Sequence, residues 1–220
     1  MCIIAPSLLE ADYKCLGEQL KTMKKAGAEY VHIDVMDGNF VPNLSCGMKM
    51  IHGLKGAADL VFDVHLMVNE PVRFVKRMQE AGADVISVHY EACSNVEDTL
   101  REIKKCGVRA GIVLNPETSA DVLTDRIWQL VDVIQVMTVH PGRDGQHFIE
   151  ESLDKIKDIH QQSVKLEEWK DIEVDGSINF ENVGKVVKAG ANIIVSGKAL
   201  FTGNLAENIA QMKQQAAMEG

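Results

Sequence analysis

Three stretches of the sequence resemble one another at regular distances along the chain. They begin at Lys25 (KAGAEYVHIDV), at Glu80 (EAGADVISVH) and at Lys188 (KAGANIIVSG). In each stretch a helical pattern reaches a glycine, which favours the end of a helix, and a run of β-branched residues follows. Each stretch therefore predicts a helix that is joined to a strand by a short loop.

The distances between these stretches constrain the fold further. Lys25 and Glu80 are 55 residues apart, and Glu80 and Lys188 are 108 residues apart. A unit of about 27 residues fits both distances, as two units and then four, and suits one strand with its helix. About eight such units fit in this chain, which predicts a parallel sheet closed into a (β/α)8 barrel. We expect a single domain over residues 1–220.

Eight β-branched runs correspond to the strands of this barrel, and amphipathic stretches such as 18–27 and 72–82 separate them. The predicted strands are residues 2–8, 30–36, 60–67, 84–90, 109–115, 132–139, 171–177 and 192–198. The alternative is an open doubly wound sheet, but no G-x-G-x-x-G fingerprint follows the first strand. The pattern therefore favours the closed barrel.

Composition and charge exclude several classes of function. The formal net charge of −9 makes binding to nucleic acid or to an anionic membrane surface through bulk charge unfavourable. No apolar run approaches the roughly 18 residues of a membrane span, and the first residues lack the basic start of a signal peptide. The five cysteines are scattered and form no C-x-x-C pair, which indicates reduced thiols. We expect a soluble, cytoplasmic protein without nucleic-acid or membrane partners.

Polar residues occur where the barrel interior is expected. Side chains alternate along a strand, so Val31, Ile33 and Val35 face the helices while His32 and Asp34 point into the barrel. The same alternation applies to the other strands. The inward residues near the strand ends are Ser7, His32, Asp34, Met36, His65, Met67, Met137 and Asp175.

This inward set predicts a metal site. Burying two imidazoles and two carboxylates without partners is very unfavourable, and a divalent cation would satisfy all four. The donor set suits Zn²⁺, Fe²⁺, Mn²⁺ or Co²⁺, with the ligands His32, Asp34, His65 and Asp175. The alternative is a hydrogen-bonded network without metal, but the strand ends are where active sites of barrels lie. The three methionines either fill the core or cover a water-poor reaction centre.

Glycine-containing turns follow the last three predicted strands. Loops after strands seven and eight of a barrel form a recurrent phosphate site. Gly176, Ser177, Gly197 and Lys198 lie in these loops and offer backbone N–H groups. The segment from Gly142 to Gly145 is a candidate flexible lid.

The motifs APSLL, HIDVMDGNFVPN, DVHLMV, VMTVHPG, EVDG and VSGKALF resemble the ribulose-phosphate 3-epimerase family. The resemblance extends from Ile4 to about Phe201, and HIDVMDG followed by FVPN is highly specific. It implies a (β/α)8 TIM barrel of the ribulose-phosphate-binding type. It also implies an isomerase with one divalent metal ion (Zn, Fe, Mn or Co), a ketose phosphate substrate and a homo-oligomer.

The resemblance also assigns roles to residues. The family's metal ligands fall on His32, Asp34, His65 and Asp175, and its acid/base pair falls on Asp34 and Asp175. Its substrate contacts fall on Ser7, His65, Met36, Met67, Met137, Gly142, Arg143, Asp144, Gly145, Gly176, Ser177, Gly197 and Lys198. One aspartate would remove the C3 proton and the other would return a proton to the opposite face through a cis-enediolate. We expect Asp34 to be the base in the ribulose direction.

Two departures from the family pattern concern the substrate. The lid reads Gly-Arg-Asp-Gly-Gln instead of Gly-Phe-Gly-Gly-Gln, so Arg143 either clamps a phosphate or pairs with Asp144. Ser177, residues 114–118 and the tail from Leu200 look more like the D-allulose-6-phosphate 3-epimerase branch. The main interpretation is interconversion of D-ribulose 5-phosphate and D-xylulose 5-phosphate, and the alternative is the six-carbon substrate. Rival hypotheses are a metal-dependent hydrolase and a binding protein that has lost catalysis.

Five further residues have narrower expectations. His89 lies at a strand end, behind the metal ligands, and His140 lies beside the lid. Asp37 has outward parity and belongs to the turn rather than to the site. Trp128 and Trp169 are interpreted as packing residues.

Overall fold

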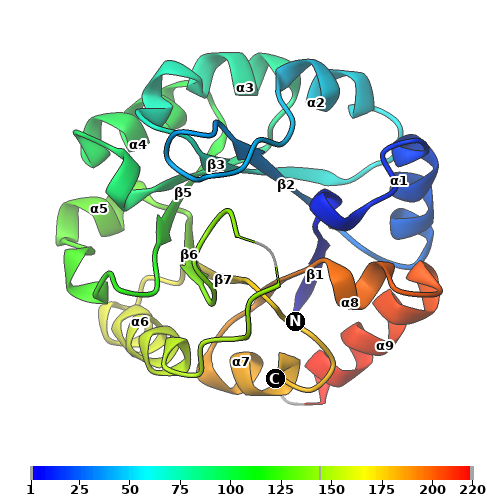
Figure 1. Ribbon diagram of the computed structural model, residues 1–220. Coiled ribbons are helices and arrows are strands. Elements are labelled where there is room, and N and C mark those ends of the chain that lie inside the picture. Colours follow the sequence, from blue (N-terminus) through cyan, green and yellow to red (C-terminus); the bar gives the residue numbers. More distant parts are fainter. Residues whose placement is uncertain (1, 144, 219–220) are drawn as a thin grey trace.

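The computed structural model describes residues 2–143 and 145–218. Within them, eight parallel strands form one barrel surrounded by helices (Figure 1). The strands are β1 (Ile3–Pro6), β2 (Tyr30–Met36), β3 (Val61–Met67), β4 (Val85–His89), β5 (Arg109–Leu114), β6 (Val133–Met137), β7 (Asp171–Asp175) and β8 (Ile193–Ser196). Each strand pairs with its sequence neighbour from β2 to β8, and β1 pairs with β8. A bridge between Ser7 and His32 joins β1 to β2, so the predicted (β/α)8 barrel is confirmed.

The helices alternate with the strands as the repeat predicted. The α-helices are α1 (Leu16–Lys25), α2 (Met48–Leu54), α3 (Val75–Ala81), α4 (Val96–Lys105), α5 (Asp125–Leu130), α6 (Ser152–Leu166), α7 (Val183–Ala189), α8 (Lys198–Phe201) and α9 (Leu205–Ala217). Short 3-10 helices are η1 (Leu8–Glu10), η2 (Pro71–Arg73), η3 (Tyr90–Ala92) and η4 (Ala120–Val122). Gly27, Gly82 and Gly190 of the three similar stretches all have positive φ, which explains why glycine stands at each helix end.

Several predicted strands extend too far at their carboxyl ends. The last strands stop at Met137, Asp175 and Ser196, before the glycine-containing turns. The chain turns away at once because Gly176 and Ser177 both have left-handed backbone angles, with φ of 127° and 54°. The predicted phosphate-loop residues Gly176, Ser177 and Gly197 therefore lie beyond the strand ends, and Lys198 begins α8.

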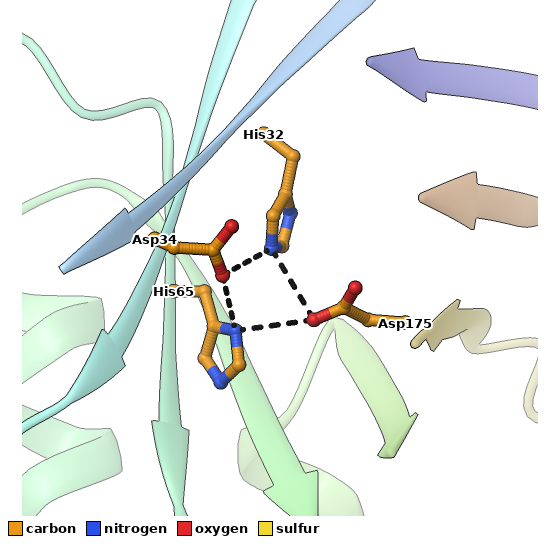
Figure 2. Close-up of side chains that lie close together, drawn as sticks. All are labelled: His32, Asp34, His65 and Asp175. Carbon is orange, nitrogen blue, oxygen red and sulfur yellow. Dashed lines mark hydrogen bonds and ion pairs between the residues drawn. The ribbon is translucent and has the colours of Figure 1, made fainter. Parts of the chain in front are cut away.

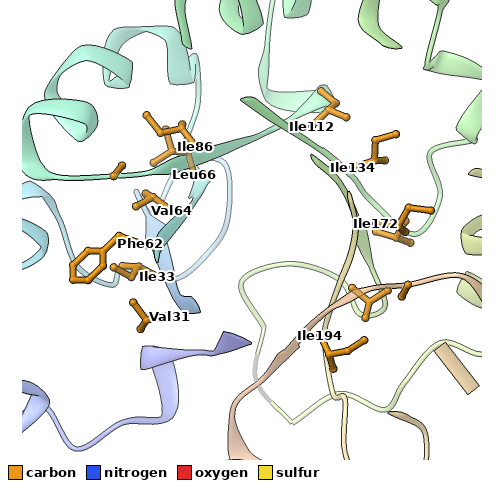
Figure 3. Packing of buried hydrophobic residues seen from close by; sticks show 14 of the residues in the cluster. Val31, Ile33, Phe62, Val64, Leu66, Ile86, Ile112, Ile134, Ile172 and Ile194 are labelled. Carbon is orange, nitrogen blue, oxygen red and sulfur yellow. The ribbon is translucent and has the colours of Figure 1, made fainter. Parts of the chain in front are cut away.

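The core has the two faces that alternation predicts. Val31, Ile33, Val64 and Leu66 point outward and pack under the helices (Figure 3). A smaller apolar cluster fills the lower barrel interior, formed by Ala5, Tyr30, Val85, Val133, Ile193 and Val195. The barrel is therefore closed by apolar packing at its amino end, and the polar residues gather toward the other end.

The two tryptophans differ in environment. Trp128 of α5 is 1% exposed and belongs to the core, as predicted. Trp169 is 73% exposed, so its interpretation as a packing residue is wrong. It follows α6 in the loop before β7, and its ring contacts His160 with 6.1 Å between centroids. Across residues 2–143 and 145–218, no helix is long and apolar enough to cross a membrane.

Candidate metal and active site

Four side chains converge near the carboxyl ends of three strands (Figure 2). His32 and Asp34 come from β2, His65 from β3 and Asp175 from β7. One ligand atom from each residue lies within 4.8 Å of all the others. His65 Nδ1 is 3.1 Å from Asp34 Oδ1 and 3.5 Å from Asp175 Oδ2. His32 Nε2 is 3.4 Å from Asp34 Oδ1 and 3.8 Å from Asp175 Oδ2. The structure thus brings together the four predicted ligands.

The donors fit a divalent cation. The Nε2 atom of His32 is buried and has no hydrogen-bond partner among the described residues, although two carboxylates face it. This nitrogen points toward the oxygens of Asp34 and Asp175 without forming a hydrogen bond to either. An ion placed between them could bind the nitrogen and both oxygens. Two nitrogen and two oxygen donors suit a borderline metal such as Zn²⁺ or Fe²⁺.

The charges of the site also favour a cation. Burial would raise the pKa of Asp34, but the imidazoles of His32 and His65 hold that pKa well below its usual range. Burial would lower the pKa of His32, but the carboxylates of Asp34 and Asp63 raise it well above its usual value. The carboxylate of Asp34 is therefore ionised and attracts positive charge. A metal ion would compete with protons for the same imidazoles, so its binding releases protons.

Ser7 positions one carboxylate. Its Oγ donates a hydrogen bond to Asp34 Oδ2 at 2.7 Å, and both residues are buried. The bridge between Ser7 and His32 holds the end of β1 beside β2. Ser7 also caps η1, because its Oγ accepts from the backbone N–H of Leu9. These contacts leave Asp34 Oδ1 directed toward the two histidines.

A second carboxylate pair lies beneath His32. The Nδ1 atom of His32 is 2.6 Å from Asp63 Oδ2 and 3.3 Å from Glu173 Oε1. Burial and the neighbouring Asp63 raise the pKa of Glu173 well above its usual value. Asp63 therefore receives the Nδ1 hydrogen of His32, which leaves Nε2 for the cation. The role of this pair was missed from the sequence, although both residues share the inward parity of the ligands.

A cavity of about 550 Å³ opens above the four residues. The predicted site residues in its lining are Ser7, Asp34, Met36, Met67, Met137, Gly142, Arg143, Gly145, Asp175, Gly176, Ser177, Gly197 and Lys198. His32 and His65 lie below it and are fully buried. Asp144, which was also predicted, lies outside the described residues. His140 lines the cavity, and so does His147, which is exposed, in agreement with its sequence-based interpretation as a surface residue.

The three predicted methionines line the cavity beside the four converging residues. Met36, Met67 and Met137 are buried and all line the cavity. Met36 and Met67 form a cluster with Val41. These apolar side chains adjoin the carboxylates and limit the access of water to them. The two interpretations from the sequence, core packing and a water-poor cover, are therefore compatible, since the methionines are packed and also face the cavity.

The rim loops are tied to one another. The amide Nε2 of Gln146 donates to the carbonyl oxygens of His140 and Arg143, which shapes the candidate lid. The hydroxyl of Ser177 donates to the carbonyl of Gln146 at 2.7 Å and joins the lid to the loop after β7. A Cβ added at Gly142 would lie 2.4 Å from Val41 Cβ, so only glycine fits there. The lid is thus anchored at both ends.

Asp37 belongs to the loop structure, as predicted. Its Oδ1 accepts hydrogen bonds from the backbone N–H groups of Asn39 and Phe40, and its Oδ2 accepts from that of Asn69. The carboxylate therefore connects the loops that follow β2 and β3. Burial would raise its pKa, but these three N–H groups lower it below the usual value.

Comparison with known proteins identifies the chain's relatives. The sequence matches the Ribulose-phosphate 3 epimerase family over residues 3–201. Ribulose-phosphate 3-epimerase of Bacillus subtilis is 44% identical over 203 residues, covering 91% of this chain and 93% of the relative. The protein of that name from Synechocystis is 42% identical over 222 residues, covering 99% and 95%. That from Escherichia coli is 40% identical over 200 residues, covering 90% and 88%.

Solved structures of lower identity share the fold alone. 3-Keto-L-gulonate-6-phosphate decarboxylase from Vibrio cholerae has a TM-score of 0.69 at 16% identity, covering all of this chain and 98% of that one. 3-Hexulose-6-phosphate synthase from Salmonella typhimurium has a TM-score of 0.66 at 17% identity, covering 100% of both chains. The match in sequence is what decides the family. With its barrel and its two-histidine, two-aspartate cluster, the chain belongs to the ribulose-phosphate 3-epimerase family.

Proposed function

We propose that this protein is a metal-dependent 3-epimerase that interconverts D-ribulose 5-phosphate and D-xylulose 5-phosphate. The observation that carries this proposal is the pair of carboxylates Asp34 and Asp175, which line one cavity from strands separated by β1 and β8. Inversion of a carbon by proton transfer needs one base and one acid at different faces of the substrate. Two carboxylates on well-separated strands suit this requirement.

The chain's own residues perform the proton transfers. Asp34, oriented by Ser7, removes the C3 proton from one face of the ketose phosphate in the ribulose direction. Asp175 delivers a proton to the other face, and the roles reverse in the opposite direction. A divalent ion, namely Zn²⁺, Fe²⁺, Mn²⁺ or Co²⁺, held by His32, Asp34, His65 and Asp175 would stabilise negative charge developing on the substrate oxygens.

The rest of the cavity suits the remainder of the substrate. The loop after β7 presents Gly176 and Ser177 along the rim, and the start of α8 presents Gly197 and Lys198, so backbone N–H groups there can hold a phosphate. Arg143 lines the cavity from the candidate lid and supplies a positive charge for the same phosphate. The methionines keep water from the carbon that loses its proton.

The five-carbon substrate is favoured over the six-carbon alternative. The relatives from Bacillus subtilis, Synechocystis and Escherichia coli are all named ribulose-phosphate 3-epimerase. They match at least 90% of this chain and at least 88% of their own length. Identity of this extent along the whole barrel supports the same reaction in this protein.

The test is hydrogen exchange at C3. The protein is loaded in turn with each of the four metal ions and incubated in D₂O with D-ribulose 5-phosphate. We expect proton NMR to show loss of the C3 proton signal together with formation of D-xylulose 5-phosphate. No exchange with any of the ions would contradict the proposal. Faster exchange with D-allulose 6-phosphate would assign the six-carbon substrate, and release of inorganic phosphate would indicate a hydrolase.

We also propose that the chain acts as one catalytic domain over residues 1–220 and assembles into a homo-oligomer. Leu44, in the loop after β2, is 73% exposed and Tyr13, after η1, is 51% exposed. The loops that carry them follow the neighbouring strands β1 and β2, and an apolar patch formed by such side chains would suit contact with a partner subunit. Light scattering after gel filtration should give a mass of at least two chains, and a monomeric mass would contradict the assembly.

A further inference from the structure

A second imidazole lies behind the ligand His65. His89, the last residue of β4, is fully buried, and its Nε2 is 2.8 Å from Nε2 of His65. The two rings are stacked with 4.9 Å between centroids and an angle of 29° between planes. The ring of Phe40 also packs against His89, with 4.8 Å between centroids. Neither the metal site nor the proton transfers described above use His89.

A carboxylate lies on the other nitrogen of His89. Its Nδ1 is 3.3 Å from Glu91 Oε2. The second carboxylate oxygen, Oε1, accepts hydrogen bonds from the backbone N–H of Asn115 at 2.9 Å and from the hydroxyl of Thr118. Glu91 is therefore held by the loop that follows β5, and a chain of contacts leads from this loop through Glu91 and His89 to His65.

The chemistry of the three groups fixes the direction of their hydrogen bonds. An ionised carboxylate only accepts, so Nδ1 of His89 carries the hydrogen that it donates to Glu91. In a ring with one hydrogen, Nε2 of His89 must then accept, and Nε2 of His65 must donate to it. In the neutral His65 ring that a metal ion would bind, the remaining nitrogen, Nδ1, is then without a hydrogen. It is this Nδ1 that faces Asp34 and Asp175.

We propose that Glu91 and His89 are positioning residues that hold the hydrogen of His65 on Nε2 and so keep Nδ1 available as a metal ligand. This inference rests on the proposed metal-dependent function. The two histidine ligands would then bind through different nitrogens. His32 offers Nε2 because Asp63 lies on its Nδ1, and His65 offers Nδ1 because His89 lies on its Nε2.

The first test is metal affinity of the full-length chain, measured with Zn²⁺ by competition against a chromophoric chelator. His89→Phe keeps a ring of similar shape but removes the acceptor, so Zn²⁺ affinity should fall about 10- to 100-fold. Glu91→Gln should also lower the Zn²⁺ affinity. Its amide can present either its oxygen or its NH₂ group to Nδ1 of His89, so it no longer requires a hydrogen on that nitrogen. His89→Gln should recover part of the affinity, since its amide oxygen can accept from His65.

The matched control is Thr118→Val. It removes the hydroxyl bond to Glu91 Oε1 and leaves the contact between Oε2 and His89 in place. It should lower thermal stability while Zn²⁺ affinity stays within about twofold of the wild-type value. If His89→Phe and Thr118→Val both bind Zn²⁺ as the wild type does, the positioning role is wrong.

The second test reads the tautomer directly. In the ¹⁵N-labelled, Zn²⁺-loaded wild-type protein, long-range ¹H–¹⁵N correlation should show His65 protonated at Nε2, with Nδ1 bound to the metal. A hydrogen on Nδ1 of His65 would overturn the inference, even if the variants fail to fold. Failure of the wild type to bind Zn²⁺, or any of the other three ions, would instead reject the metal site of the proposed function.

Discussion

At the scale of single residues, Asp34 and Asp175 each take part in the proposed metal site and in the proposed proton transfers. Asp34 is held by a hydrogen bond from Ser7 and by the two imidazoles, whereas Asp175 lies at the end of β7 beside the rim loops. Replacing either aspartate therefore removes a candidate metal ligand together with a proposed acid or base. A change at a neighbour such as Ser7 alters the orientation of the carboxylate and leaves the carboxylate itself in place.

Asp175→Asn should lower the rate of epimerisation by about 10²- to 10⁴-fold, which is the usual contribution of a general acid or base. The amide is similar in shape, so the circular dichroism spectrum should be unchanged. The rate is measured by coupling D-xylulose 5-phosphate formation to a second enzyme. Glu181→Gln, an exposed residue of the following loop, is the control and should keep the wild-type rate. A wild-type rate in Asp175→Asn would remove this residue from the mechanism.

Ser7→Ala should lower kcat about 10- to 150-fold and change KM less, because a hydrogen bond to a charged group contributes about 1.5–3 kcal/mol. The loss leaves Asp34 Oδ2 without its donor and loosens the base. Steady-state kinetics with D-ribulose 5-phosphate measures both constants. Ser119→Ala is matched, since Ser119 also caps a 3-10 helix but lies away from the cavity. Equal kcat in the two variants would show that the Ser7 contact does not act on catalysis.

At the scale of elements, the loops after the strands are held by side chains that bond backbone groups. Asp37 connects the loops after β2 and β3, Gln146 shapes the lid, and Ser177 joins the lid to the loop after β7. These bonds satisfy backbone groups that no strand or helix pairs. The rim therefore has a defined shape although it consists of loops.

Asp37→Asn should lower the free energy of unfolding at pH 7 by about 1 kcal/mol, because the amide has one uncharged oxygen acceptor and its NH₂ group cannot accept from an N–H group. The folded pKa of Asp37 is lowered, so its stabilisation is present above the unfolded pKa of about 3.9 and is lost as the pH falls through the folded pKa. The difference between variant and wild type should therefore vanish in acid.

Chemical denaturation between pH 7 and pH 2.5 measures this difference. Asp59→Asn is the control, because the Asp59 side chain is fully exposed and pairs only with Lys24 in the described residues. Its variant should differ little from the wild type at any pH. A constant difference for Asp37→Asn across the whole range would show that the carboxylate charge is not what the loops use.

At the scale of the whole molecule, the barrel interior is layered. Apolar side chains fill the amino end, the buried pair Asp63 and Glu173 lies above them, and the four candidate ligands and the cavity come last. The buried carboxylates gain their favourable partners from imidazoles and from the proposed cation. Metal binding and folding should therefore be coupled.

Addition of Zn²⁺ at about 100 times its Kd should stabilise the fold by about 2.7 kcal/mol, because the ion binds only the folded chain. For a chain of this size the midpoint of thermal unfolding should rise by several degrees, about 2–4 °C per kcal/mol. Calorimetry with Zn²⁺ and with a chelator measures the shift. His32→Gln should show almost none, and an equal shift in that variant would place the ion elsewhere.

The architecture and the inward position of the four candidate ligands could be predicted from the sequence because both depend on local order. Glycine stops and β-branched runs recur with one spacing, and alternation along a strand assigns His32, Asp34 and Met36 to the inner face. Strand ends were predicted less well, because turns such as Gly176–Ser177 depend on backbone angles that β-branched neighbours do not reveal.

What the sequence determined by itself is the repeat, the barrel and the parity of each strand residue, since these follow from patterns only a few residues long. The tertiary structure decided which nitrogen of each histidine faces which partner. Register places His65 beside Asp34, and rotamers direct Asp63 to His32 and His89 to His65. These partners lie 24 to 31 residues apart in the chain. Their contacts depend on how strands pair and side chains pack, which no local pattern encodes.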